Sequence, residues 1–276
     1  MGSGLKISSN PGANAAVRSL RTSSTALYRA VDRLSSGLRV NSAADGSASM
    51  SASENMRAQE GGFRQALRNV NDGVAMVQTA EAAYQAISDT LVRMRVLAIE
   101  AASDSIADAE RGFLDAEFAV LITEMDRVAS VTEFNNTKLL DGSKASVTFQ
   151  IGTSNSTFNR VIVALETQGA TASGVADDQI DTVADAQVAL DAIDDALQSL
   201  NTDRAGLGSS ISKMNLALND IASSITTYGR AIGNLRDADI GMESGELARQ
   251  QVLQTSGAAM LLQANAATSV TLQLLR

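Results

Sequence analysis

The sequence contains no cysteine, no histidine and no tryptophan, and it has one proline among 276 residues. Without cysteine and histidine the chain cannot form disulfides, thiolate zinc sites, cysteine nucleophiles or histidine-based catalytic triads. Aromatic residues make up only 3% of the chain, whereas apolar residues make up 45%. Such a composition argues against an all-β sandwich and favours long helices. What remains is an enzyme working with carboxylates alone, or a protein without catalytic chemistry.

The chain is acidic overall, with a net charge of −9. This charge argues against nucleic acid and anionic membranes as partners. No run of about 18 apolar residues is present, so we expect no membrane span. No apolar signal-peptide run opens the chain, and these targeting rules alone predict a cytoplasmic protein.

Hydrophobic spacing predicts four long helices. Apolar residues recur every three or four positions within 17–38, 63–91 and 114–128, with a loop near 103–105. The fourth pattern is the longest: fifteen positions from Ala186 to Leu235 step alternately by four and three, and all but Arg204 are apolar. A 3.5-residue repeat of this length indicates a supercoiled helix. Residues 180–235 would span roughly 80 Å, which predicts a rod.

Two further features complete the expected fold. Apolar residues alternate with polar ones on both sides of a polar turn, which predicts a β-hairpin at about 145–165. The last 30 residues present a broad apolar face that needs a partner helix, as does the helix at 17–38. We therefore predict a mainly α protein: an elongated rod of long coiled-coil-like helices with a small β-hairpin, both termini forming paired helices.

Five blocks, in the same order along the chain, resemble bacterial flagellin. They are residues 32–43 (DRLSSGLRVNSA), 68–73 (RNVNDG), 134–140 (FNNTKLL), 235–239 (LRDAD) and 263–265 (QAN). The chain departs from the family at 44–47, where the family has a charged run, and at 267–268, where a proline is common. Only residues 166–180 separate the hairpin from the long helix, so the chain resembles a minimal form lacking the outer domains.

The resemblance implies a structural subunit that polymerises into the bacterial flagellar filament, the helical propeller for swimming, with no enzymatic activity, cofactor or metal. Residues 1–45 with 235–276 would form inner-tube terminal helices. Residues 46–234 would form a rod domain of three long helices with the hairpin. The protein would be secreted through the flagellum's own channel and would be extracellular, which replaces the cytoplasmic prediction.

The implied partners are further copies of the chain, the flagellar export apparatus and a chaperone, the filament cap and the hook-junction proteins. The apolar residues predicted to make terminal polymerisation contacts are Leu20, Leu27, Val31, Leu34, Leu247, Leu261, Leu262 and Leu272.

A second candidate site is the segment Arg93, Arg95 and Leu97, with Glu117 on the next helix. It resembles the flagellin segment recognised by a Toll-like receptor of animals. The alternative interpretation is that these residues make filament contacts between neighbouring rods.

The remaining patterns favour a structural role over a ligand-binding one. Eight aspartates between 177 and 203 fall on a predicted helix, which favours a solvated face over a calcium site. Gly61–Gly62 and Gly206–Gly208 lack the setting of a phosphate loop and predict close approach or bending. Residues 169–174 are expected to form a surface loop that accepts an insertion. Two alternatives to a filament subunit stay open: a hook–filament junction protein, and a surface polysaccharide-binding flagellin homologue.

Overall fold

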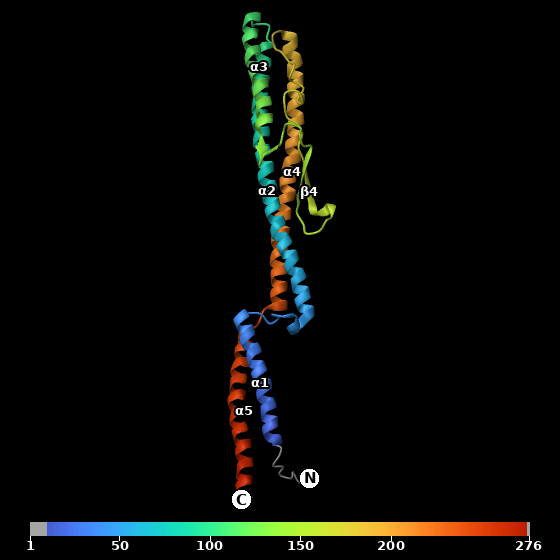
Figure 1. The fold of residues 1–276 in the computed structure, drawn as a ribbon. Helices are drawn as coiled ribbons and strands as arrows, with labels where there is room; N and C mark the ends of the chain where they lie inside the picture. The colour runs from blue at the N-terminus through green and yellow to red at the C-terminus, as the bar shows by residue number, and fades with distance from the viewer. Residues whose placement is uncertain (1–9, 275–276) are drawn as a thin grey trace. The chain divides into compact units, whose positions relative to one another are not determined.

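A computed structural model describes the backbone of residues 10–274 and the side chains of residues 10–266 (Figure 1). The chain divides into two compact units: residues 1–58 with 227–276, called here the terminal unit, and residues 59–226, the central unit. In chain order the elements are α1 (Pro11–Ser36), α2 (Ala43–Ala101), α3 (Asp108–Val131), β1 (Glu133–Phe134), β2 (Thr137–Lys138), β3 (Ser146–Gln150), η1 (Thr157–Asn159), β4 (Arg160–Ala164), α4 (Val183–Arg236) and α5 (Ile240–Leu274).

The central unit is an elongated helical bundle of α3 with the greater part of α2 and α4. From residue 59 to its end, α2 spans about 65 Å at 1.5 Å per residue. The seam predicted for α2 is its core, since Val70, Val77, Tyr84 and Leu91 are at most 1% exposed. The core is completed from α3 and α4 by Phe118, Met125, Ile193, Leu200, Leu207, Met214 and Ile221. The prediction of a mainly α, elongated fold is confirmed.

Among the polar residues that interrupt the predicted seams, Glu81 in α2 and Arg204 in α4 face each other. Arg204 Nη2 lies 2.7 Å from Glu81 Oε1 and donates to Gln85 Oε1 at 2.8 Å. The two charged side chains are 27% and 35% exposed, so water still reaches them. Each charge in the seam therefore meets its counter-charge instead of being buried alone.

Two antiparallel hairpins follow α3. β1 and β2 are joined by Asn135 and Asn136, whose φ angles are 47° and 61°. Asparagine tolerates this left-handed conformation, which two-residue hairpin turns require. The Asn-Asn pair favours a turn at this point, but the two-residue strands beside it are too short to show an alternating pattern. β3 pairs with β4 from Ser146↔Ala164 to Gln150↔Arg160, which confirms the predicted hairpin.

The connection between β4 and α4 is packed against the bundle. Ala170 and Val175 are fully buried, and Ala170 N donates to Asp126 Oδ1 at 2.7 Å. Within residues 169–174, which were expected to form a surface loop, only Ala170 is buried, whereas Thr171, Ala172 and Gly174 are exposed. The expected surface loop is therefore exposed around its turn and anchored at Ala170, and its tolerance of an insertion stays a prediction.

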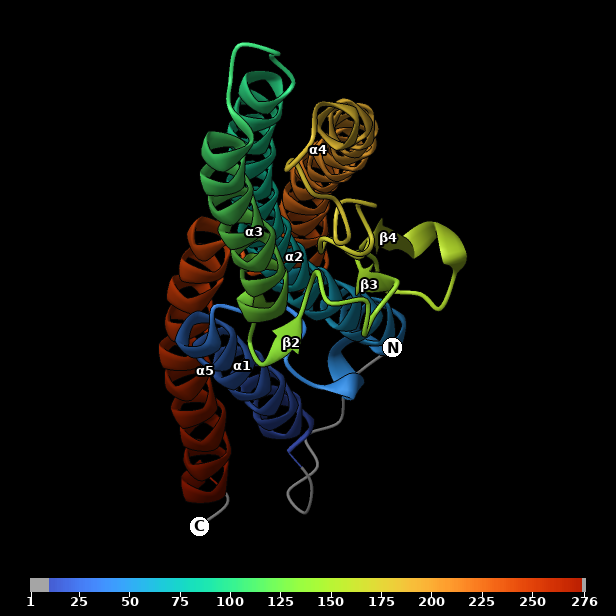
Figure 2. The same cartoon turned by 90° about the horizontal axis from the view of Figure 1, so that it is seen from above.

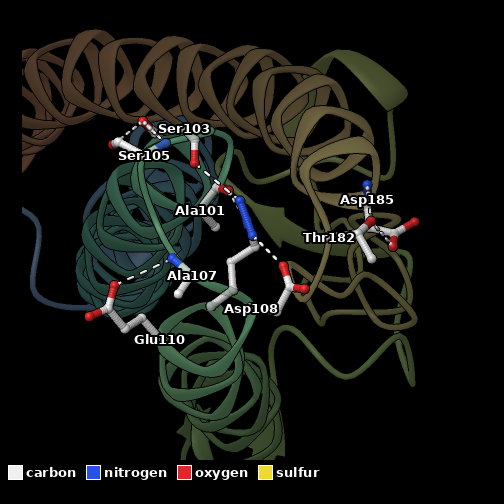
Figure 3. Close-up of polar contacts among 9 residues, drawn as sticks. Ala101, Ser103, Ser105, Ala107, Asp108, Glu110, Thr182 and Asp185 are labelled. Carbon is white, nitrogen blue, oxygen red and sulfur yellow. Dashed lines mark hydrogen bonds and ion pairs between the residues drawn. The ribbon is translucent and has the colours of Figure 1, made fainter.

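Arg111, 4% exposed, closes the turn between α2 and α3. Figure 3 labels three residues around this turn that accept hydrogen bonds from this side chain: Ala101, Ser103 and Asp108. Its guanidinium donates from Nε to Ala101 O at 2.8 Å, from Nη2 to Ser103 O at 3.1 Å and from Nη1 to Asp108 Oδ1 at 2.9 Å. The last carbonyls of a helix have no partner inside the helix, so Arg111 satisfies groups that α2 leaves open. The predicted break near 103–105 is confirmed.

In the terminal unit, α1 begins earlier than its apolar pattern predicts. Asn10 Oδ1 accepts from Ala13 N at 3.0 Å, and Pro11 occupies the first turn. Both are helix-start signals that operate without an apolar repeat. The helix ends before Gly37, whose φ of 70° suits glycine at a helix end.

Candidate assembly surfaces

Helices α1 and α5 lie side by side and run antiparallel within the terminal unit (Figures 1 and 2). Asn10 Nδ2, before the start of α1, donates to Ala264 O near the end of α5 at 2.9 Å. At the other end of the pair, Arg33 Nη1 lies 2.9 Å from Glu243 Oε1. The prediction that both termini form paired helices is confirmed.

The pair meets along a seam of alternating three- and four-residue steps. All seam side chains are buried or half-buried: Leu20, Ser23, Leu27, Ala30 and Leu34 on α1, with Leu247, Gln250, Gln254, Gly257 and Leu261 on α5. At Gly257 a Cβ atom would stand 3.1 Å from Leu20 Cγ. Glycine therefore sets how closely the two helices approach there.

A polar pair sits in the middle of this seam. Ser23 and Gln250 are 7% and 8% exposed, and Ser23 Oγ donates to Gln250 Oε1 at 2.7 Å. Gln250 Nε2 in turn donates to Glu246 Oε1 at 2.6 Å. A polar residue in an apolar seam is tolerated only opposite its partner, so this pair favours one register of α1 against α5.

The segments that follow α1 and α4 are also joined. Ala238 N donates to Gly37 O at 2.9 Å, and Arg39 N donates to Arg236 O at 2.6 Å. The Arg236 guanidinium lies 2.8 Å from Glu54 Oε1 at the start of α2. Three segments of the terminal unit therefore meet at one hydrogen-bonded junction.

The outer faces of the helix pair keep large apolar side chains in solvent. Exposed are Tyr28 and Val31 on α1, and Ile240, Met242, Val252, Leu253, Met260 and Leu262 on α5. A two-helix pair has no third layer to cover such residues. Large apolar residues left exposed on one pair of helices make these faces candidates for an interaction surface.

The predicted polymerisation residues divide between these two environments. The half-buried ones lie in the α1–α5 seam: Leu20, Leu27, Leu34, Leu247 and Leu261. Val31 and Leu262 are exposed on the outer faces, 47% and 73% respectively. Leu272 lies outside the described side chains. Val252 and Met260 belong to the broad apolar face predicted for the last helix but were not among the predicted contacts, and the exposed Met242 lies outside that face's pattern.

The second predicted set is divided among three places in the central unit. Arg93 Nη2 lies 2.5 Å from Glu117 Oε1, which links α2 to α3. Arg95 Nε lies 2.7 Å from Asp194 Oδ1, which links α2 to α4. The hydrogen bond from Arg95 lowers the pKa of the Asp194 carboxyl. Leu97 is 1% exposed and belongs to the core, so it is not part of a surface patch.

A pocket of about 470 Å³ lies between α4 and the connection that precedes it, and its lining includes Glu166, Asp195 and Asp203. Burial raises the pKa of Asp203, although its carboxylate accepts from Gln168 Nε2 at 2.8 Å. Across residues 10–266, no three or more acidic side chains are grouped so as to hold a metal ion. Within the same described part of the chain, no helix has the length and apolarity needed to cross a bilayer.

Two solved structures resemble this fold. A flagellin of Bacillus cereus superimposes with a TM-score of 0.51 and 26% identity, covering 56% of this chain and 88% of that one. A Vibrio parahaemolyticus protein assigned as flagellar hook-associated gives 0.58 at 14% identity, covering 70% of this chain and all of that one. Because its sequence identity is only 14%, the Vibrio parahaemolyticus structure supports the fold alone.

Sequence comparisons cover most of the chain. Residues 7–145 match the bacterial flagellin N-terminal helical region, and residues 190–275 match the C-terminal helical region. A flagellin of Halalkalibacterium halodurans is 34% identical over 90% of this chain and 91% of its own length. The flagellar filament 33 kDa core protein of Treponema phagedenis is 32% identical (98% and 99% covered), and Bacillus subtilis flagellin 31% (99% and 100%). The chain therefore belongs to the bacterial flagellin family, as a structural subunit of the flagellar filament that lacks the outer domains.

Proposed function

We propose that the subunit polymerises through the outer faces of the α1–α5 pair, while the seam between the two helices holds that pair together. The observation that supports this division is the exposure of eight large apolar residues on a pair whose own seam is already filled. Burying one such side chain stabilises a contact by about 1.5–3 kcal/mol. Several of them, repeated at every subunit, suffice to hold a filament.

The geometry of such contacts suits an open polymer. A surface that meets a different surface on the next copy makes a head-to-tail contact, and rotation that does not close gives a helical filament. In this proposal residues 1–45 with 235–276 form the inner helices, and residues 46–234 form the surrounding layer with the hairpin. These proposed domain limits differ from the limits of the two compact units, which fall at 58/59 and 226/227.

Seeded assembly of the purified subunit, followed by electron microscopy, tests the proposal. Leu262→Asp should abolish elongation while leaving monomer helicity unchanged, because Leu262 is 73% exposed in the isolated chain. Leu262→Met keeps the apolar volume and should assemble like the original chain. Normal filaments from Leu262→Asp would show that the outer face of α5 is not an assembly surface.

We further propose that the subunit leaves the cell through the flagellar export apparatus, held by a chaperone beforehand, and that it meets the filament cap and the hook-junction proteins during assembly. The role is mechanical, without catalytic chemistry or cofactor. A strain in which flagellar export is blocked should retain the protein inside the cell.

Arg93, Arg95 and Glu117 provide a second proposed contact, with neighbouring subunits in the filament and with a Toll-like receptor on the released monomer. Their side chains are 54%, 42% and 45% exposed, which supports access. Leu97 supports this surface from the core without touching a partner. Binding of the monomer to a receptor ectodomain should weaken in Arg93→Ala and Arg95→Ala, and unchanged binding in both would contradict the receptor role.

A further inference from the structure

The tip of the β3–β4 hairpin presents an aromatic ring to solvent. Phe158, in η1, is 91% exposed, the highest value among the exposed large apolar residues of the described chain. Figures 1 and 2 both show this loop projecting from the side of the central unit. One exposed apolar residue says little by itself, so the significance of Phe158 depends on how the loop holds it.

The loop around Phe158 is fixed by side-chain hydrogen bonds. Gln150 Nε2 donates to Gly152 O and Ser154 O, both at 2.9 Å. Ser156 Oγ accepts from Phe158 N at 3.4 Å. The remaining links are Asn159 Nδ2 to Ser154 O at 3.2 Å, and Arg160 to Gln150 and Asn155. A ring presented by an ordered loop loses little conformational freedom on binding.

The loop is also fastened to α2. Thr153 Oγ1 donates to Gln59 Oε1 at 2.5 Å. A Cβ at Gly62 would stand 2.7 Å from Thr153 Cγ2, so glycine permits this approach. The close approach predicted for Gly61–Gly62 is thus present at Gly62, with a loop as the neighbour, whereas Gly61 has open space around it.

A receiving site of suitable size lies at the base of the same hairpin. A pocket of about 420 Å³ is lined by Met76 of α2, Phe134 of β1 and Val147 of β3, with Asp72 and Lys144 also in its lining. A benzyl side chain fits such a volume. Sulfur and aromatic groups around a ring make favourable contacts.

We propose that Phe158 of one copy inserts into the Met76–Phe134–Val147 pocket of a neighbouring copy in the filament. Knob and pocket are different surfaces of one molecule, so the contact is head-to-tail and propagates without closing. The pocket lining carries one acidic and one basic side chain, Asp72 and Lys144, so the fit rests on the apolar ring and the apolar part of the lining. The inference rests on the proposed function, since it requires polymerised subunits.

The critical concentration for assembly tests the knob. Phe158→Ala should raise it by about tenfold or more, since losing a buried aromatic contact weakens binding by at least that factor. Ile162→Ala is the matched control, because Ile162 is 65% exposed on the same hairpin. An unchanged critical concentration for Phe158→Ala, with normal filaments, overturns the knob and leaves polymerisation intact. If the unaltered chain does not polymerise, the proposed function itself fails.

Photocrosslinking tests the pocket. With p-benzoylphenylalanine in place of Phe158, irradiated filaments should give crosslinked dimers in which the probe is attached to the peptide containing Met76 or Val147. The same probe in place of Ile162 should not reach that pocket. Dimers joined at another site, or no dimers from filaments that do form, overturn the assignment of the pocket.

Discussion

At the scale of single residues, the seam of the terminal unit depends on one buried polar contact. Ser23 and Gln250 occupy positions where apolar side chains would pack at least as well. Their hydrogen bond spans 227 positions of sequence, yet it joins the middle of α1 to the middle of α5. A one-turn slip of either helix would leave both groups buried without a partner, at a cost that opposes the slip.

Ser23→Ala should therefore weaken the α1–α5 pair. The substitution leaves Gln250 Oε1 buried without its donor, which costs about 1–3 kcal/mol. Filaments of the variant should dissociate at a lower temperature, measured by light scattering on heating. Thr22→Ala is the control, since Thr22 is exposed and donates only to its own helix. A Ser23→Ala filament as stable as the Thr22→Ala filament would contradict a structural role for this contact.

Asp178 predicts a pH-dependent effect in the central unit. Its Oδ2 atom is buried without a hydrogen-bond partner, and burial, with the charge of Asp177, raises its pKa. At neutral pH the folded chain therefore carries an unfavourable carboxylate. Protonation removes this disadvantage as the pH falls through the raised pKa.

Asp178→Asn should accordingly raise the melting temperature at pH 7 by about 1–2 °C, a small gain because the group is partly solvated. The gain should shrink as the pH falls and vanish below the ordinary aspartate value. Asp181→Asn, at an exposed position, provides the control in the same calorimetric series. A gain in melting temperature that grows as the pH falls would contradict this explanation.

At the scale of elements, α2, α4 and the hairpin of the central unit pack closely together at Gly73, where α2 has no side chain. A Cβ at Gly73 of α2 would stand 3.1 Å from Phe149 and 3.2 Å from Met214 Cε. The hairpin and α4 therefore both pack onto the bare backbone of α2 at this point. Gly61, in the same helix, has open space around it.

Substitution of these two glycines should change the free energy of unfolding in opposite directions. Gly73→Val should lower the free energy of unfolding by about 1–3 kcal/mol, because the added volume displaces a packed side chain. Gly61→Ala should raise it by about 0.5–1 kcal/mol, because alanine favours the helix and meets nothing. Urea denaturation of each variant checks both, and a stable Gly73→Val chain would mean that the three elements separate easily.

Periodicity predicts the helices and hairpin because their signals are local. The seam of α4 can be read from fifteen positions in the sequence. Its one polar position, Arg204, faces Glu81, one of the polar positions in the α2 seam. The packed connection before α4 could not be predicted in the same way. Ile180 is fully buried, and its backbone N donates to Asp115 Oδ1 of α3 at 2.9 Å, a contact between residues 65 apart.

The assembly surface was predictable only in part, for a similar reason. Leu20 and Leu261 were identified from the repeat, which marks a seam. Leu262 was identified too, but a repeat cannot say which apolar residues a partner helix will cover. Leu97 fits a family segment by spacing, yet its burial is decided by α3 and α4.

At the scale of the whole molecule, the two units differ in how much they bury. In the described part of the terminal unit only five residues are buried: Ser23, Ala30, Val40, Ser53 and Gln250. The remaining buried residues of the described chain belong to the central unit. Segments with few buried contacts open at low free energy.

Limited proteolysis of the monomer should consequently cut α1 and α5 before it cuts residues 59–226. In the filament the same helices should resist, because polymer contacts cover their outer faces. Mass spectrometry of the fragments at successive times gives the order of cleavage. Equal resistance of α1 and α5 in monomer and filament would contradict burial on assembly.

The antiparallel seam joins the beginning of the described chain to its end, since Leu20 packs against Gly257. The first helix therefore has no partner until the last one has been made. A chain whose synthesis stops early, even with a complete central unit, carries an α1 whose apolar row has nothing to pack against. A subunit shortened before α5 should therefore lack the paired helices altogether, however well its central unit folds.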